Sequence, residues 1–189
     1  EENSYNLETQ LASGLIDFVI AKGPVTNIYK FTALPLFREE FLLGLPKDHP
    51  VKERAVRSGD AAHPWLGLQE VLNECFILLK PGHHTRFMAD QFFAQSQFVP
   101  AKTIVTANIE TALRMAVAGL GIVFVPSFFT IGNACHQSKL DFYSVGAHPL
   151  QRTYTEFSIM YRQETHLTKY AKEFIRIMQD YCREFFAGE

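Results

Sequence analysis

Residues 115–126 read MAVAGLGIVFVP, and this stretch carries the clearest structural pattern in the chain. Gly119 is placed to end a helix, and Gly121 is placed to form a tight turn. The run Ile122–Val125 is continuously apolar, which predicts a central parallel strand that ends at Pro126. The preceding helix starts at Asn108, a good N-cap residue. Its apolar stripe, at the spacing of one helix face, consists of Ile109, Ala112, Leu113, Ala116 and Val117.

The alternation of strand and helix extends to both sides of this stretch. Cys75–Leu79 predicts a buried strand, and Thr85–Gln97 predicts a helix after a Pro-Gly break. Lys102–Ala107 is rich in β-branched residues and predicts a further strand, while Leu140–Val145 predicts a weaker one. Strands that alternate with helices over residues 75–145 favour parallel βαβ units, with helices on both faces of one sheet.

The two ends of the chain contain further elements. Leucines at spacing four predict a first helix that ends near Gly14: Leu7, Leu11 and Leu15. Strands are expected at Ile16–Ala21, Tyr29–Leu36, Glu40–Leu45 and, by alternation, around Phe157–Tyr161. Thr168 is expected to cap a long closing helix. The predicted buried face of that helix consists of Leu167, Ala171, Phe174, Ile175, Met178 and Tyr181.

Composition excludes several classes of protein. A formal net charge of -2 gives the chain no basic bias towards a nucleic-acid backbone. No apolar run approaches the roughly 20 residues of a membrane helix. The three cysteines form no CxxC pair, which disfavours a zinc ribbon and fits free thiols in a reducing cytosol. The chain also lacks a GxSxG elbow, a Walker loop and a dinucleotide-binding GxGxxG, so no catalytic residue and no cofactor are expected.

Four segments, in order along the chain, resemble the effector-binding domain of LysR-type transcriptional regulators. They are LASGLIDFVI at 11–20, the stretch from Pro35-Leu36 to His49-Pro50 with Glu40 inside it, MAVAGLGIVFVP at 115–126, and Leu167–Phe174. The resemblance implies an α/β fold like type 2 periplasmic binding proteins, with two Rossmann-like subdomains joined by two crossing strands. It assigns 1–43 and 158–189 to subdomain I and 44–157 to subdomain II.

Family members carry a strand, a helix and a strand before the point that corresponds to residue 1. The resemblance therefore implies that the N-terminal part of the first subdomain is missing here. Family members also have a winged helix-turn-helix and a linker helix, and neither is present in this sequence. Binding to DNA is accordingly expected only through a domain absent from this chain.

The effector is expected between the subdomains, where helix N-termini favour anions. One candidate is the strand-to-helix turn, with Lys80, His83, His84 and Thr85 as contacts. The other candidates are Asn108 and Ile109 at the next helix start, Pro126 at a strand end, and Asn3 and Ser4 at the first helix. Adjacent histidines rarely share one metal ion, so no metal site is predicted.

The leading hypothesis is a cytoplasmic allosteric sensor that binds a small, possibly anionic effector. It is expected to form homodimers or homotetramers and to make no contact with a membrane. A transport-type solute-binding protein is the alternative, and a small α/β enzyme lacks a site. Some LysR relatives sense peroxide with two cysteines. Because His84 and Phe93 stand near those positions here, no thiol-based peroxide sensing is expected.

Overall fold

The computed structural model describes residues 4–22, 29–57, 59, 61–130, 138–146, 148–149, 153–163 and 167–186. The chain forms two compact units, one of Glu1–Glu39 with Tyr154–Glu189 and one of Glu40–Thr153. The sequence-based boundaries, after residues 43 and 157, lie four residues further along the chain in both cases. Strand β2 (Phe31–Pro46) contributes residues to both units.

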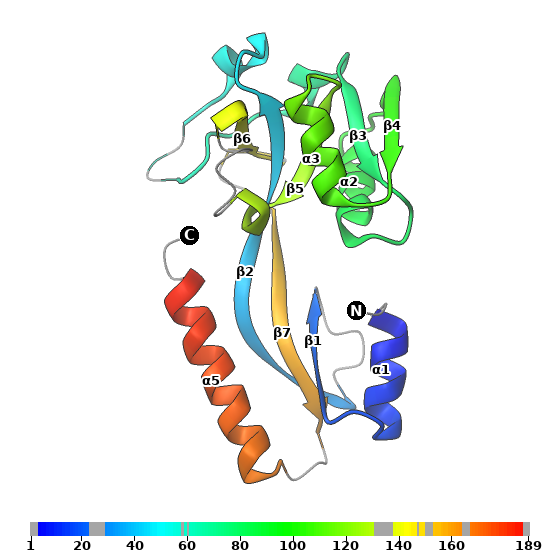
Figure 1. Ribbon diagram of the computed structural model, residues 1–189, viewed down its shortest axis with the longest axis vertical. Helices are drawn as coiled ribbons and strands as arrows, with labels where there is room; N and C mark the ends of the chain where they lie inside the picture. The colour runs from blue at the N-terminus through cyan, green and yellow to red at the C-terminus, as the bar shows by residue number, and fades with distance from the viewer. Residues whose placement is uncertain are drawn as a thin grey trace. The chain divides into compact units, whose positions relative to one another are not determined.

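Unit 2, residues 40–153, is built on a mixed sheet with the order β6-β2-β5-β3-β4 (Figure 1). Its further strands are β3 (Cys75–Leu79), β4 (Lys102–Thr106), β5 (Ile122–Pro126) and β6 (Leu140–Ser144). Strand β3 pairs in parallel with β4 and β5, while β2 runs antiparallel to β5 and β6. The predicted parallel βαβ units are therefore confirmed for β3, β4 and β5.

Two helices cover opposite faces of this sheet, as the sequence predicts. Helix α2 (His84–Gln95) packs in a core with Phe41, Phe76 and Phe124, where the Phe124 ring lies 5.4 Å from the ring of Phe41 and 5.8 Å from the ring of Phe76. Helix α3 (Ile109–Val117) packs in a second core with Leu42, Ile77 and Val123. Neighbouring residues of β3 and of β5 enter different cores, which explains why these two strand sequences are apolar without interruption.

The turn from α3 into β5 follows the glycine pattern. Gly119 has φ +75° and donates its N–H to the carbonyl of Ala116, which ends the helix. The described part of unit 2 also contains three short 3₁₀ helices: η1 (Pro50–Arg54), η2 (Leu68–Val71) and η3 (Ser127–Thr130). Helix η2 is a single 3₁₀ turn.

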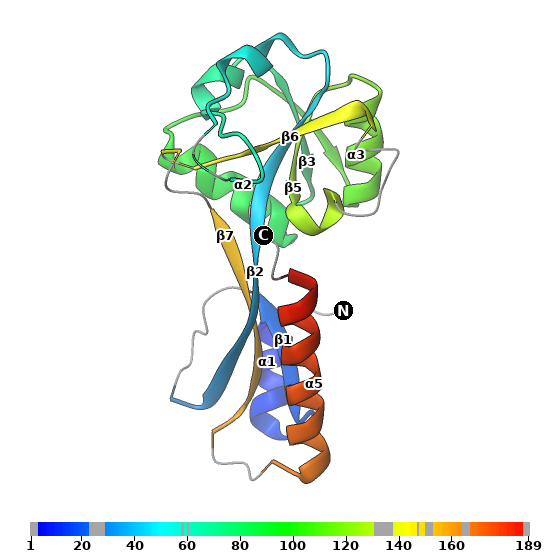
Figure 2. The same cartoon turned by 90° about the vertical axis from the view of Figure 1, so that its left-hand side faces the viewer.

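Among the described residues of unit 1, three strands form a sheet that lies between two helices. Strand β7 (Tyr154–Arg162) lies between β1 (Phe18–Lys22), with which it is antiparallel, and β2. Helix α1 (Ser4–Ser13) covers one face, and α5 (Lys169–Phe186) covers the other (Figures 1 and 2). Thr168 caps α5 as predicted, because its hydroxyl accepts the N–H of Ala171 at 3.2 Å.

The first helix ends near Gly14 as predicted, since α1 ends at Ser13, Gly14 has φ +80° and Leu15 lies beyond the helix. Two other sequence-based expectations are wrong. The strands expected at Tyr29–Leu36 and Glu40–Leu45 form one strand, β2, because Phe37 stacks on Phe157 and Phe186 and keeps the chain extended. On α5, only Ile175 of the predicted buried face is buried, while Tyr181 is 57% exposed.

Candidate functional site

The carboxyl ends of three strands meet at one edge of the unit 2 sheet. Strands β3, β4 and β5 are parallel, so Leu79, Thr106 and Pro126 end on the same side. The N–H of Lys80 donates to the carbonyl of Thr106 at 3.1 Å and ties the ends of β3 and β4 together. The edge of a sheet where strands end is the usual position for ligands in α/β proteins.

The turn from β3 into α2 brings four predicted residues to this edge. Gly82 has φ +96°, a backbone conformation that glycine adopts without strain. His83 is the N-cap of α2, and its carbonyl accepts the N–H of Phe87 at 3.0 Å. The helix predicted at Thr85–Gln97 is α2, which begins one residue earlier, at His84, and ends at Gln95. Thr85 is half-buried in the first turn and cannot serve as the cap.

Arg86 is a charged residue of this turn that the sequence reading did not single out. Its side chain is 23% exposed, and Nη1 donates to the carbonyl of Leu79 at 3.2 Å. Its Nε contacts both carboxylate oxygens of Asp90, at 2.8 and 3.0 Å. The guanidinium therefore fixes the end of β3 to α2. The sequence feature that could have identified Arg86 is its spacing of four residues from Asp90 on one helix, which allows an ion pair.

The start of α3 adds two more predicted residues. The side-chain oxygen of Asn108 accepts the N–H of Thr111 at 2.8 Å, which is the interaction of an N-cap. Ile109 is half-buried and packs against the α3 core. Glu110 pairs with Arg114 at 3.1 Å, so its charge is partly balanced at this helix start. Ser4 begins α1 in unit 1, and Asn3 lies outside the described residues.

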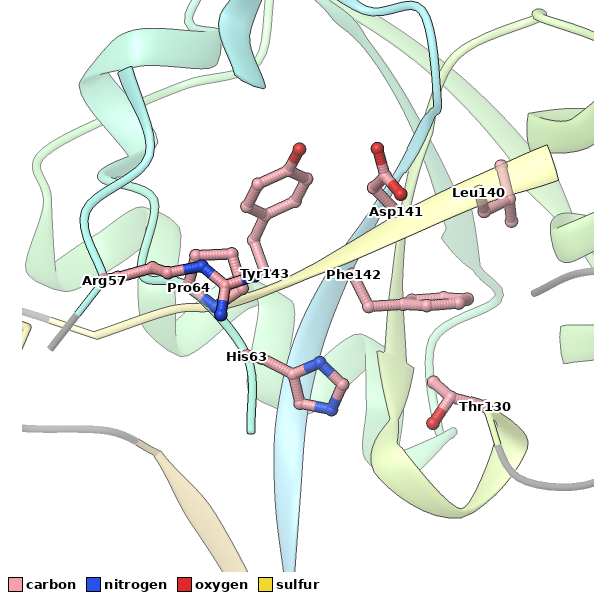
Figure 3. Close-up of a pocket in the computed structure, with 8 residues that line it drawn as sticks. All are labelled: Arg57, His63, Pro64, Thr130, Leu140, Asp141, Phe142 and Tyr143. Carbon is pink, nitrogen blue, oxygen red and sulfur yellow. The ribbon is translucent and has the colours of Figure 1, made fainter. Parts of the chain in front are cut away.

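A pocket of about 360 Å³ lies elsewhere in unit 2, and the sequence reading missed it (Figure 3). It is lined by Arg57, His63, Pro64, Thr130, Leu140, Asp141, Phe142 and Tyr143. Burial, and secondly the charge of Asp141, raise the pKa of the Tyr143 hydroxyl, so this group stays protonated at neutral pH. None of the residues expected to bind an effector lines this pocket.

Two further properties bear on the kind of site. Among the described residues, no group of three His, Cys, Asp or Glu side chains is arranged to hold a metal ion. No helix in the described part of the chain combines the length and the apolar character needed to cross a membrane.

Known proteins resemble the chain in sequence and in structure. The HTH-type transcriptional regulator CfxR of Cupriavidus necator is 33% identical over 153 residues, which cover 72% of this chain and 46% of CfxR. The regulatory domain of Synechocystis PCC6803 CcmR in complex with 2-PG has a TM-score of 0.70, 14% identity, and coverage of 96% of this chain and 80% of that chain.

The BenM effector-binding domain with its effector benzoate has a TM-score of 0.68 and 19% identity. That similarity covers 99% of this chain and 77% of the BenM domain. The chain spans less than half the length of CfxR. The family model for the LysR substrate binding domain matches residues 1–183. The chain therefore belongs to the LysR substrate-binding domain family, whose members are regulatory and not enzymatic.

Proposed function

We propose that this domain senses a small organic anion and that the edge formed by the ends of β3, β4 and β5 supplies one wall of the binding site. Family membership supports an effector-binding role. The observation that carries the position is the convergence of two helix N-termini and three strand ends, which brings Lys80, Thr85 and Asn108 to one edge.

The electrostatics of this edge favour an anion. The first amides of an α-helix have no acceptor within the helix, and the helix dipole places positive potential there. Lys80 and His83 are exposed and add donors beside the α2 start. The Glu110 carboxylate would oppose an anion, but its contact with Arg114 reduces that effect. A carboxylate is the ligand group that these features suit best, and benzoate, which BenM binds, is a carboxylate.

The regulatory part of the proposal follows from the family. The effector controls DNA binding by a separate helix-turn-helix domain, within a homodimer or homotetramer in the cytoplasm. An effector shifts such an equilibrium only if it binds two conformations with different affinity. A carboxylate that contacts the α2 start in one conformation more closely than in the other would meet this condition.

The test compares two threonines. A thermal-shift screen of mono- and dicarboxylates, benzoate included, finds a binder, and calorimetry then measures its affinity for the wild type and for Thr85→Val. Loss of the hydroxyl is expected to weaken binding about tenfold, because a charge-assisted hydrogen bond contributes about 1.5–3 kcal/mol. Thr103→Val is the matched control, since Thr103 is exposed within β4 and away from the strand end. Equal affinity in the wild type and Thr85→Val would place the effector elsewhere.

A further inference from the structure

We infer, on the basis of the function proposed above, that Arg86 binds the carboxylate of the effector at the strand-end edge and makes this site selective for an anion. Strand β3 pairs with β4 at all five of its residues, Cys75–Leu79, but with β5 only at Phe76 and Ile77. In the described part of the chain, the ladder therefore does not join the carboxyl ends of β3 and β5.

The chain leaves β3 and β5 in opposite directions at this edge. From β3 it runs through α2 to β4, which lies on one side of β3 (Figure 1). From β5 it runs through η3 towards β6, which lies on the opposite side, beyond β2. Ligands of open α/β sheets bind outside the carboxyl ends of the strands at such a switch point. The charged group of an effector is therefore expected between the ends of β3 and β5.

The guanidinium of Arg86 lies on the β5 side of the end of β3. The N–H of Lys80 donates to the carbonyl of Thr106, on β4, at 3.1 Å. The carbonyl of Leu79 belongs to the same trans peptide group, so it points the opposite way, to the side of β5. Nη1 of Arg86 donates to that carbonyl at 3.2 Å. The guanidinium therefore occupies the side of β3 on which the switch point lies.

Two contacts hold this guanidinium and leave part of it available to a ligand. Its Nε donates to both carboxylate oxygens of Asp90, at 2.8 and 3.0 Å, so the side chain is fixed before a ligand binds. Among the described residues, none accepts a hydrogen bond from Nη2. Arginine carries five N–H donors in a planar fork, and the contacts with Leu79 and Asp90 use two of them. The remaining donors can bind a carboxylate.

The other cations of this turn are less able to select an anion. Lys80 and His83 are both exposed, and contacts between exposed charges are weakened by water. The Arg86 side chain is only 23% exposed, so a charge that meets it is screened less. The Asp90 carboxylate contacts Nε, whereas a ligand bound to Nη2 uses a different nitrogen of the fork. Arg86 is therefore the cation that distinguishes an acid from a neutral ligand of the same shape.

The experiment compares benzoate with benzamide, which has the same ring but a neutral amide group in place of the carboxylate. NMR of the ¹⁵N-labelled 189-residue chain follows the backbone amide of Thr85 and the Nε–H signal of Arg86 during each titration. We expect benzoate, at concentrations up to tens of millimolar, to shift both signals. It should bind about tenfold more tightly than benzamide, because it gains a charge-assisted contact with the guanidinium.

Three variants separate charge recognition from a structural role. Arg86→Gln should remove the preference for benzoate, whereas loss of a merely structural contact would weaken both ligands and keep their ratio. Arg86→Lys keeps the charge but not the fork, and should weaken benzoate several-fold and leave benzamide unchanged. Arg54→Gln is the matched control and should keep the wild-type ratio, because Arg54 is exposed and pairs with Glu70 at 2.7 Å. Arg54 follows the end of β2, which is antiparallel to β5, so it lies at the opposite edge of the sheet.

Circular dichroism checks that each variant is folded, and if Arg86→Gln is unfolded, Arg86→Lys decides. The inference is overturned if Arg86→Gln keeps the benzoate preference, if Arg86→Lys binds benzoate as tightly as the wild type, or if Arg86→Gln and Arg54→Gln give the same ratio. In these cases the proposed function still stands, provided that benzoate shifts the Thr85 amide and Thr85→Val weakens its binding. If benzoate shifts neither signal, the inference fails together with the proposed position of the site.

Discussion

Replacing Gly121 with Ala should destabilise unit 2 by about 1.5–4.5 kcal/mol. Gly121 precedes β5, and a Cβ at this position would overlap the carbonyl oxygen of Cys75 and lie 3.1 Å from its carbonyl carbon. Both atoms belong to the backbone at the start of β3, so no side-chain rotation can relieve the overlap. The strands must separate where Phe76 pairs with Ile122. Overpacking costs about 1–3 kcal/mol, and one lost ladder hydrogen bond adds about 0.5–1.5 kcal/mol.

The control is Gly119→Ala, two residues earlier in the same turn. Gly119 has φ +75°, and a Cβ there would meet no atom within 4 Å. Its cost is therefore conformational only, about 1–2 kcal/mol for a non-glycine residue in the left-handed region. Gly119→Asn should cost less, since asparagine tolerates this conformation better than alanine.

Urea unfolding followed by circular dichroism measures all three variants. For a chain of this length, a loss of about 1.5–4.5 kcal/mol lowers the melting temperature, measured in a separate thermal scan, by roughly 3–18 °C. The expected order of stability is wild type, Gly119→Asn, Gly119→Ala and Gly121→Ala. If Gly121→Ala loses less stability than Gly119→Ala, the close approach of β3 and β5 at Cys75 is not a constraint and the reasoning is refuted.

Three further predictions concern unit 1, the thiols and DNA. Arg162→Met should lower the free energy of unfolding by about 2–4 kcal/mol, because Nη1 of Arg162 donates to the carbonyls of Leu11 and Ile16 at 2.6 and 2.9 Å. Urea unfolding measures this loss, and an equal loss in the surface variant Arg176→Met would contradict the prediction. Mild peroxide should produce no disulfide detectable by mass spectrometry among Cys75, Cys135 and Cys182. Burial raises the pKa of the Cys182 thiol and suppresses its reactive thiolate, and Cys135 lies outside the described residues; a specific reversible bridge would overturn the prediction. The isolated chain, with net charge -2, should give no sequence-specific gel shift at physiological salt, and a specific shift would show an unrecognised DNA-binding surface.

The elements that the sequence predicted best are those whose pattern is local. The helix start at Asn108, the stripe of α3 and the glycine that ends it all depend on residues within a few turns of each other. Strand β5 begins at Ile122 and ends at Pro126, as predicted. The family resemblance could also be detected from the sequence, because its four segments occur in order along the chain. Local patterns therefore specified most of unit 2.

Expectations failed where distant contacts decide the structure. Two separate strands were expected at Tyr29–Leu36 and Glu40–Leu45, yet Phe37, which lies between them, stacks on Phe186 from the far end of the chain at 3.9 Å. On α5, apolar residues surround more of the helix than the sheet can cover, which leaves Tyr170, Ile177 and Tyr181 exposed. Periodicity shows which residues share a face. It does not show which part of a broad apolar face meets the sheet.

The strand-end edge and the pocket beside β6 also differ in how far the sequence could predict them. The ends of β3, β4 and β5 were predictable, because parallel strands joined by crossover helices must end at one edge. The second pocket depends on two long-range contacts. Residues 140–144 of β6 pair with residues 42–46 of β2, and residues 63–66 lie along the other edge of β6. No local pattern encodes that lateral order. It is fixed by Ser144, whose backbone and hydroxyl contact the chain at His63, Pro64 and Leu66, and an ordinary serine in a weakly patterned strand gives no sign of this role.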